Sequence, residues 1–424
     1  MGDWNTKTLG EIAELIMGQS PEGKYYNSEG KGMPFLQGCS EFGKYHPDTT
    51  VYSTDAKKIA PKSSILFSVR APVGKTNLAD KAYCIGRGIA AIKGKTVDND
   101  FLNHSIFFKN INDGFTSQGS TFASINYSEL SKLAIYLPDE KKEQATIATI
   151  LTTIDQAIEG TEQLIAKYER IKTGLMQDLL TRGIDEQRNI RTEETHEFKD
   201  SGLGRIPKEW EIYKISDLGE WKGGKTPRKS VRRFWNNAQC LWYTSKDIVK
   251  DVLTDSFYKI TEEAVNETNQ TVFPAFESLI FVFRSGILRH TFPIARSNTR
   301  FSVNQDLKVL VPKKGISSDF LFQKFKSLES YFLKVAVKVG TTVESVDGHV
   351  FFNIEGGIPQ AQEQEKITEI LKGVDAEIEL LTLGLVKYHR QKIALMQDLL
   401  TGKVRVDNMA SDITSKIIKY GIVQ

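Results

Sequence analysis

The sequence has 424 residues, of which 40% are hydrophobic and 26% are charged. These fractions are typical of a folded globular protein and exclude a disordered chain. The 56 basic residues nearly balance the 53 acidic ones, which excludes a histone-like polycation but allows local basic patches. Three widely separated cysteines cannot build a disulfide framework or a zinc site, and no apolar run approaches the roughly 18 residues of a membrane span. We therefore expect a cytoplasmic protein with no membrane contact.

Residues 1–138 mix short β-rich runs with loops that contain glycine and proline, which predicts a compact α+β domain. The expected strands lie at 64–69, 89–92 and 133–137. Arg70 follows the first of these strands. An arginine at a strand end can donate two hydrogen bonds to guanine, and it can equally pair with a carboxylate. The sequence leaves both possibilities open.

Residues 139–183 predict a long helix, because apolar side chains recur at alternating steps of four and three. Such a stripe is typical of helices that pair along a seam. Its breadth also suits a bundle, so helices of another protein could cover part of it. The seam residues are Ile147, Leu151, Ile154, Ile158, Leu175 and Leu179.

Residues 184–204 are dense in charged and polar side chains, which is typical of a linker. Residues 205–358 predict a second α+β domain, with strands at 278–283 and 307–311. This region carries a net charge of about +6, against about +2 for residues 1–138. Five cations lie within 225–235, where they alternate with hydroxyls and precede aromatic residues. That pattern suits phosphate contacts, and a solvated surface loop is the alternative.

Residues 359–403 repeat the helical segment, and residues 404–424 form a tail. Segment 363–401 shares 19 residues with segment 143–181 over 39 aligned positions without a gap. Weaker matches upstream keep the same order, so the chain is a duplicated module. An antiparallel pair of helices would separate the two variable domains as a rigid spacer. The second set of seam residues is Ile367, Leu371, Val374, Ile378, Leu395 and Leu399.

One enzyme motif is present: residues 219–226 match the Walker A pattern of nucleotide-binding loops. A true P-loop needs a buried strand before it and a helix that opens at the lysine. Pro227 follows Thr226 directly, and the residues before Gly219 are polar. We expect the match to be accidental, and the sequence shows no metal-binding or hydrolase motif.

The order of motifs resembles that of the specificity (S) subunits of type I restriction-modification systems. The matching segments of the first half lie at 18–21, 68–74, 86–88, 143–144 and 178–181. Those of the second half lie at 201–210, 224–227, 242–247 and 398–403. The resemblance implies two target-recognition domains that alternate with two conserved helical regions, which is the plan derived above.

The resemblance implies that each variable domain recognises one half of a bipartite, asymmetric site on double-stranded DNA. The helices would set the spacer length and dock two methyltransferase (M) subunits, with restriction (R) subunits joining the complex. This subunit would be non-catalytic and hold no cofactor, whereas S-adenosylmethionine, ATP and Mg would belong to its partners. Alternatives are a coiled-coil adaptor that binds no DNA and, least favoured, a nucleotide-binding P-loop protein.

The side chains that we expect to contact DNA are polar, basic or aromatic and come from both variable domains. They are Gln19, Ser20, Lys24, Tyr25, Arg70, Lys75, Lys225, Thr226, Arg228, Lys229, Arg232, Arg233, Arg284, Ser285 and Arg289. Asn304-Gln305-Asp306 replaces Gly86-Arg87-Gly88 in the second domain. Two domains that differ at such positions should recognise different half-sites.

Overall fold

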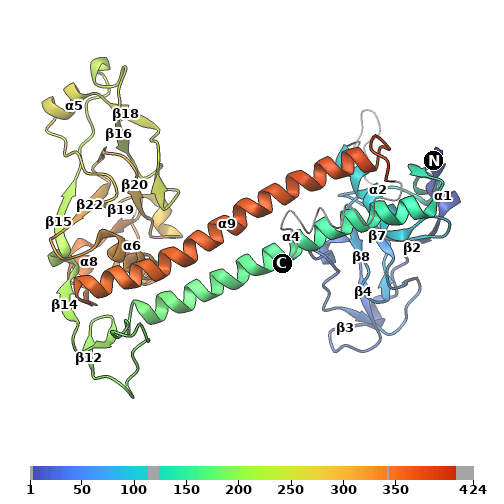
Figure 1. The fold of residues 1–424 in the computed structure, drawn as a ribbon, viewed down its shortest axis with the longest axis horizontal. Coiled ribbons are helices and arrows are strands. Elements are labelled where there is room, and N and C mark those ends of the chain that lie inside the picture. The colour runs from blue at the N-terminus through green and yellow to red at the C-terminus, as the bar shows by residue number, and fades with distance from the viewer. Residues whose placement is uncertain (1–2, 113–123, 341–342, 407–424) are drawn as a thin grey trace. The chain divides into compact units, whose positions relative to one another are not determined.

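The structure is a computed structural model that describes residues 3–112, 124–340 and 343–406. The chain divides into two compact units (Figure 1). The first unit comprises residues 1–164 and 381–424, and the second comprises residues 165–380. Each unit therefore contains one globular domain together with part of each long helix, as a duplicated chain predicts.

The first unit is built on two mixed or antiparallel sheets and a short β-ladder. A four-stranded sheet has the order β2-β10-β7-β8, a five-stranded sheet has the order β3-β5-β4-β9-β6, and β1 pairs with β11. The strands are β1 (Trp4–Thr8), β2 (Ala13–Met17), β3 (Tyr26–Asn27), β4 (Met33–Leu36), β5 (Tyr52–Ser53), β6 (Ile59–Ala60), β7 (Ile65–Ser68), β8 (Thr76–Leu78), β9 (Tyr83–Ile85), β10 (Ile89–Gly94) and β11 (Ala134–Pro138). The helices are α1 (Leu9–Ile12), α2 (Asn99–Asn112) and α3 (Tyr127–Ser131).

The second unit repeats this plan with longer connections. Its main sheets have the orders β15-β22-β19-β20-β17 and β18-β16-β21, and β14 pairs with β25 as β1 does with β11. The strands are β12 (Phe198–Ser201), β13 (Gly204–Pro207), β14 (Glu211–Lys214), β15 (Gly219–Gly223), β16 (Cys240–Tyr243), β17 (Val252–Leu253), β18 (Tyr258–Ile260), β19 (Leu279–Val282), β20 (Ile294–Ser297), β21 (Phe301–Val303), β22 (Leu307–Pro312), β23 (Val337–Lys338), β24 (Ser345–Val346) and β25 (Glu355–Ile358). The helices are α5 (Glu262–Glu267), α6 (Ser318–Ser327), α7 (Glu329–Ala336) and α8 (Gly348–Phe352). The expected strands of both domains are confirmed, as is the α+β class.

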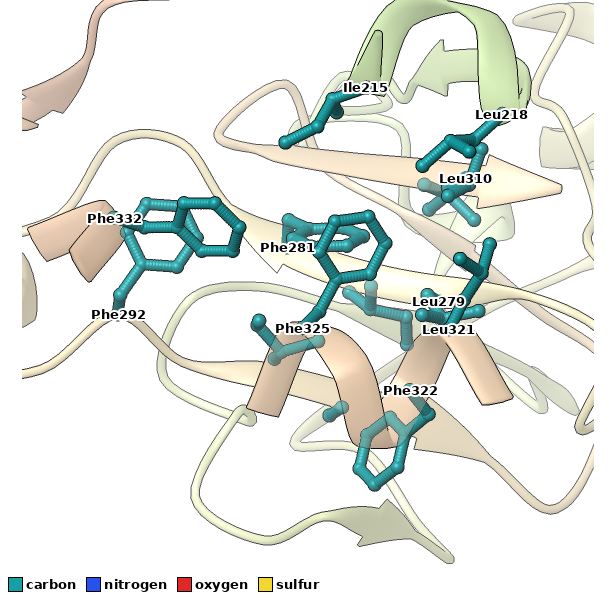
Figure 2. Packing of buried hydrophobic residues seen from close by; sticks show 14 of the residues in the cluster. Ile215, Leu218, Leu279, Phe281, Phe292, Leu310, Leu321, Phe322, Phe325 and Phe332 are labelled. Atoms are coloured by element: carbon teal, nitrogen blue, oxygen red, sulfur yellow. The ribbon is translucent and has the colours of Figure 1, made fainter. Parts of the chain in front are cut away.

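The core of the second unit lies between the face of its main sheet and helix α6, and aromatic rings dominate it (Figure 2). Phe281 on β19 meets Phe325 on α6 edge to face, with ring centroids 5.2 Å apart. Phe332 on α7 packs against Phe292, with centroids 5.3 Å apart. All four rings are buried, and a buried aromatic ring is among the largest single sources of stability in a core. This core fixes the strand ends that carry the candidate site.

The two long helices are α4 (Lys141–Leu179) and α9 (Ala361–Leu399), each of 39 residues. Within the first unit, Lys392 on α9 pairs with Asp155 on α4 at 2.6 Å. Within the second unit, Lys172 on α4 pairs with Asp375 on α9, also at 2.6 Å. Asp155 aligns with Asp375 in the repeat and Lys172 aligns with Lys392, so the duplicated residues form two equivalent contacts between the helices.

The seam residues are most deeply buried near the globular domains. Ile147 and Leu151 are fully buried in the first unit, as are Ile367 and Leu371 in the second. The remaining buried seam residues are Ile154, Ile158, Leu179 and Leu399. Leu175, Val374, Ile378 and Leu395 are partly buried. The expected pairing stripe thus merges with the domain cores at the ends of the helices.

The repeated Glu-Gln motif ties each long helix to its globular domain. Gln144 donates to the Pro138 carbonyl at 2.7 Å and accepts from the Asp98 amide at 2.8 Å. Gln364 makes the equivalent contacts, with the Pro359 carbonyl at 2.8 Å and the Ser317 amide at 2.7 Å. Both glutamines are buried, so these contacts satisfy backbone groups that water cannot reach.

The adjacent glutamates hold the segments that follow the long helices. Arg405, after α9, donates to Glu143 at 2.7 and 2.8 Å in the first unit. Arg191, after α4, donates to Glu363 at 2.6 and 3.2 Å in the second unit. The segment expected to be a linker is therefore anchored: it contains this buried arginine and β12, which pairs with β13. The tail is likewise attached through Arg405 up to Val406, and residues 407–424 lie outside the described part.

Candidate nucleic-acid interface

In the first unit, three loops meet beside the ends of β2, β7 and β10. The Gly18 amide donates to the Ile89 carbonyl at 2.9 Å, and the Gln19 amide donates to the Ile85 carbonyl at 2.9 Å. A Cβ atom on Gly18 would lie 2.1 Å from the Gly86 carbonyl oxygen. Only glycine permits this approach, which brings the loop after β2 against the loop that precedes β10.

Polar and basic side chains gather where these loops touch. The Ser20 hydroxyl accepts from the Arg87 amide at 3.2 Å, and it lies 3.2 Å from the Gln37 amide nitrogen. The Val69 amide donates to the Gly88 carbonyl at 3.0 Å, which places Arg70 on the neighbouring strand end. We define Ser20, Gln37, Arg70 and Arg87 as the first loop cluster.

The second unit builds an equivalent cluster with different side chains. The Gly224 amide donates to the Asn304 carbonyl at 3.3 Å, and the Thr226 hydroxyl donates to the Gln305 side chain at 2.6 Å. The Arg284 amide donates to the Asp306 carbonyl at 3.1 Å. We define Thr226, Arg284 and Gln305 as the second loop cluster.

Four cations within residues 228–233 are expected to contact DNA, and they differ in whether they have a carboxylate partner. Arg228, Lys229 and Arg232 have no carboxylate partner among the residues described. Arg233 instead donates to Glu263 at 2.6 Å and to Glu267 at 2.8 Å, and these glutamates raise the pKa of its guanidinium. The first three cations can therefore meet an external anion without first breaking an ion pair.

Two further residues predicted to contact DNA, Ser285 and Arg289, lie beyond the end of β19. Arg289 pairs with the buried Glu344 at 2.5 Å, which lowers the pKa of that carboxyl. The Ser285 amide donates to the Glu344 carbonyl at 3.1 Å. Both residues thus help to position the loop that carries Arg284. Lys225 directly precedes Thr226 of the second cluster, and its amide donates to the Gln270 side chain at 3.3 Å.

In the first unit the remaining predicted contacts are more dispersed. Lys24 pairs with Glu22 at 2.6 Å and lies 5.0 Å from the ring centroid of Tyr25. The Lys75 carbonyl accepts from the Ser68 amide at 2.8 Å, so this lysine belongs to the turn after β7. Gln19 continues the glycine loop beside Ser20. Among the residues that the structure describes, Lys24 and Tyr25 form no ion pair or hydrogen bond with the first loop cluster.

The Walker-like segment does not have the structure of a P-loop. Residues 219–223 are strand β15, and no helix begins at Lys225 or Thr226. A nucleotide-binding loop requires a helix at that point, whose amides bind phosphate. The expectation of an accidental match is confirmed.

Three residues of the two clusters are not among those predicted from the sequence to contact DNA, namely Gln37, Arg87 and Gln305. Arg87 and Gln305 lie in equivalent loops that precede β10 and β22. The segments 86–88 and 304–306, which differ between the two domains, could have indicated both residues. Gln37 lies after β4, and nothing in its neighbourhood of the sequence distinguishes it. Only the sheet topology brings it to Ser20.

Together these features define a duplicated protein with one polar and cationic loop cluster in each unit. A family model described as "Type I restriction modification DNA specificity domain" matches residues 1–170 and again residues 207–386. These matches cover most of the chain, so the protein belongs to the type I restriction-modification specificity family.

Curated relatives that match part of the chain are named as specificity subunits of type I restriction enzymes. The chain is 39% identical over 183 residues to the putative type I restriction enzyme MjaX specificity subunit of Methanocaldococcus jannaschii, covering 42% of this chain and 43% of that protein. It is 30% identical over 278 residues to the EcoR124I/EcoR124II specificity subunit of Escherichia coli, covering 65% of this chain and 64% of that protein. The chain thus spans between about two fifths and two thirds of these relatives.

Solved structures share the fold across nearly the whole chain. The type I restriction-modification S subunit from M. genitalium superposes with a TM-score of 0.59 at 16% identity, covering 94% of this chain and 96% of that one. A chain from a study of complex assembly and conformational transition of the type I R-M system gives a TM-score of 0.57 at 15% identity, covering 94% and 97%. In the described ranges, none of the helices is long and apolar enough to cross a membrane.

Proposed function

We propose that the chain is the DNA sequence-specificity subunit of a type I restriction-modification complex. Each globular domain recognises one half of a bipartite, asymmetric site on double-stranded DNA. The observation that carries this proposal is the pair of loop clusters, which occupy equivalent places but present different side chains. The first unit presents Ser20, Gln37 and Arg87 in its cluster. The second unit presents Thr226 and Gln305 at the equivalent place. Equivalent positions with different donors and acceptors suit two different half-sites.

The chemistry of the clusters fits this division of labour. Amide side chains match the donor and acceptor pattern of adenine, and arginine matches that of guanine. Cations without a carboxylate partner, such as Arg228 and Lys229, supply the sequence-independent attraction to phosphates. The polar groups would select bases, and the cations would hold the duplex against them.

The long helices would act as a spacer and as the docking surface for two methyltransferase subunits. In the first unit, Leu383, Val386 and Ile393 of α9 are 63%, 45% and 61% exposed. Exposed apolar side chains at these helical intervals suit partner helices. The subunit itself would be non-catalytic and cytoplasmic. S-adenosylmethionine, ATP and Mg would serve the methyltransferase and restriction subunits.

Reconstitution tests this function. Methyltransferase subunits from the same host, supplied with S-adenosylmethionine, should methylate a bipartite sequence only when the chain is added. DNA affinity should fall steeply as salt rises, because phosphate contacts release counterions. Methylation that does not depend on the chain would contradict the proposal. Partner binding with no DNA affinity at low salt would favour a protein adaptor.

A further inference from the structure

The side chain of one phenylalanine in the second unit lies largely in solvent. Phe257, between β17 and β18, is 78% exposed. Its amide donates to one carboxylate oxygen of Asp247 at 2.6 Å, while the other oxygen accepts from the Thr244 amide and hydroxyl, each at 2.8 Å. The backbone is therefore pinned where the ring emerges. The Phe257 ring is therefore exposed on a turn whose backbone is held by hydrogen bonds.

This ring is the outer member of a group of aromatic side chains, which we call the aromatic shelf. Phe257 contacts Tyr258 edge to face, with ring centroids 4.9 Å apart. Tyr258 in turn meets Trp235 at 6.0 Å, and Trp235 meets Trp242 at 5.4 Å. Trp242 is buried, so the shelf runs from the domain interior to the exposed ring.

The basic segment is attached to the shelf by direct contacts. The Trp235 indole donates to the Arg228 carbonyl at 3.2 Å, and the Trp242 indole donates to the Lys225 carbonyl at 3.1 Å. The Lys229 ammonium lies 5.7 Å from the ring centroid of Tyr258. The shelf also joins the second loop cluster, because Thr226 follows Lys225 directly. Phe257 is thus linked through the shelf to Arg228, Lys229 and Thr226.

The charges beside the ring favour a polyanionic occupant. The nearby Asp247 uses its carboxylate on backbone amides, and Asp255 pairs with Lys259 at 3.0 Å. Arg228, Lys229 and Arg232 retain no carboxylate partner among the residues described. A docking protein would need a strongly acidic face to match them. Duplex DNA supplies phosphates for the cations and apolar base edges, such as the thymine methyl group, for the ring.

We propose that Phe257 packs its ring against bases of the half-site that the second unit recognises, while Arg228, Lys229 and Arg232 hold the flanking phosphates. This inference rests on the proposed function and adds a contact that phosphate binding alone does not predict. Apolar contact with base edges contributes affinity that depends weakly on salt, whereas phosphate contacts depend on it strongly.

The test uses the full chain with its methyltransferase subunits and a fluorescein-labelled duplex that carries the methylated target. Phe257→Ala should weaken binding by about 10-fold, because it removes an apolar contact with base edges. Its plot of log Kd against log salt should keep the slope of the unchanged protein. Lys229→Ala should instead reduce that slope by about one phosphate contact. Phe276→Ala is the matched control, since Phe276 is a 47% exposed phenylalanine of the same unit.

The outcomes separate this inference from the function on which it rests. If the unchanged complex binds the duplex and Phe257→Ala binds equally well, the inference is overturned and the function stands. A Phe257→Ala protein that keeps its DNA affinity but loses methyltransferase subunits would also overturn it, and would identify a protein-docking surface. If the unchanged complex does not bind the duplex at all, the proposed function itself fails.

Discussion

At the scale of single residues, buried charges decide how the segments after the long helices are held. Glu143 is 3% exposed and accepts two hydrogen bonds from Arg405, which lies 262 residues away in the chain. These hydrogen bonds are the main reason why the pKa of Glu143 is lowered. The carboxylate therefore stabilises the fold when ionised, and the last described residues form part of the first unit.

Replacing Arg405 should lower the stability of the protein, because Glu143 is nearly buried. Arg405→Ala leaves a nearly buried carboxylate without its guanidinium and should lower the free energy of unfolding by about 3 kcal/mol at pH 7. The folded pKa of Glu143 lies below the unfolded value of 4.5, so the contribution is complete above that pH. It should disappear as the pH falls through the folded pKa. Urea unfolding of both proteins from pH 7 downward measures it.

Lys403→Ala provides the control for this substitution, since Lys403 makes only an exposed ion pair with Asp398 at 3.2 Å. Its effect should stay within about 0.5 kcal/mol. A stability difference for Arg405→Ala that is absent at pH 7, or that does not change with pH, would show that the ion pair contributes nothing to the fold.

Lys324 is a second buried charge, and its effect on stability also rises with pH, but in the alkaline range. Its ammonium donates to the Leu180 carbonyl, just beyond the end of α4, and lies 5.4 Å from the ring centroid of Trp210. Burial lowers its pKa from 10.5 to about 8. Because the unfolded chain keeps this proton to higher pH, the folded state gains stability as the pH rises from about 8 to 10.5.

Lys324→Met should remove that gain. Relative to the variant, the unchanged protein should become more stable by about 3 kcal/mol between pH 8 and pH 10.5. The measurement is the difference in unfolding free energy between the two proteins across this range. A constant difference would mean that Lys324 titrates in the folded protein as it does in water.

At the scale of elements, the sequence predicts what depends on neighbours in the chain. The heptad repeat identifies α4 and α9, and short apolar runs locate β7, β10 and β19, because these signals are local. The contact between Ser20 and Gln37 depends on sheet order, and the exposure of Phe257 depends on a turn held by Asp247. Neither has a periodic signal, so both required the structure.

The two long helices also carry a prediction about spacing. Insertion of seven residues into both α4 and α9 keeps the heptad phase and adds about 10 Å of helix. If the helices act as a spacer, the unrecognised gap between half-sites should grow by about three base pairs. Mapping of methylated adenines measures the gap. The spacer role would be refuted if the half-sites changed and the gap did not.

At the scale of the whole molecule, the uneven distribution of charge explains why the total is nearly balanced although the proposed ligand is a polyanion. One module of about 200 residues occurs twice, and each copy supplies one loop cluster and one long helix. The basic excess is concentrated in the second domain, while the helices are close to neutral. Each unit also contains part of both helices, so a change in one domain leaves the other unit's contacts in place.

The exchange of one globular domain tests the central proposal most directly. Residues 205–358 are replaced by the corresponding region of a related specificity subunit, and methylated adenines are mapped in a host that supplies the methyltransferase subunits. The proposal predicts a bipartite motif in which one half-site is unchanged and the other is that of the donor protein. An unchanged motif, or one altered in both halves, would contradict the assignment of one half-site to each domain.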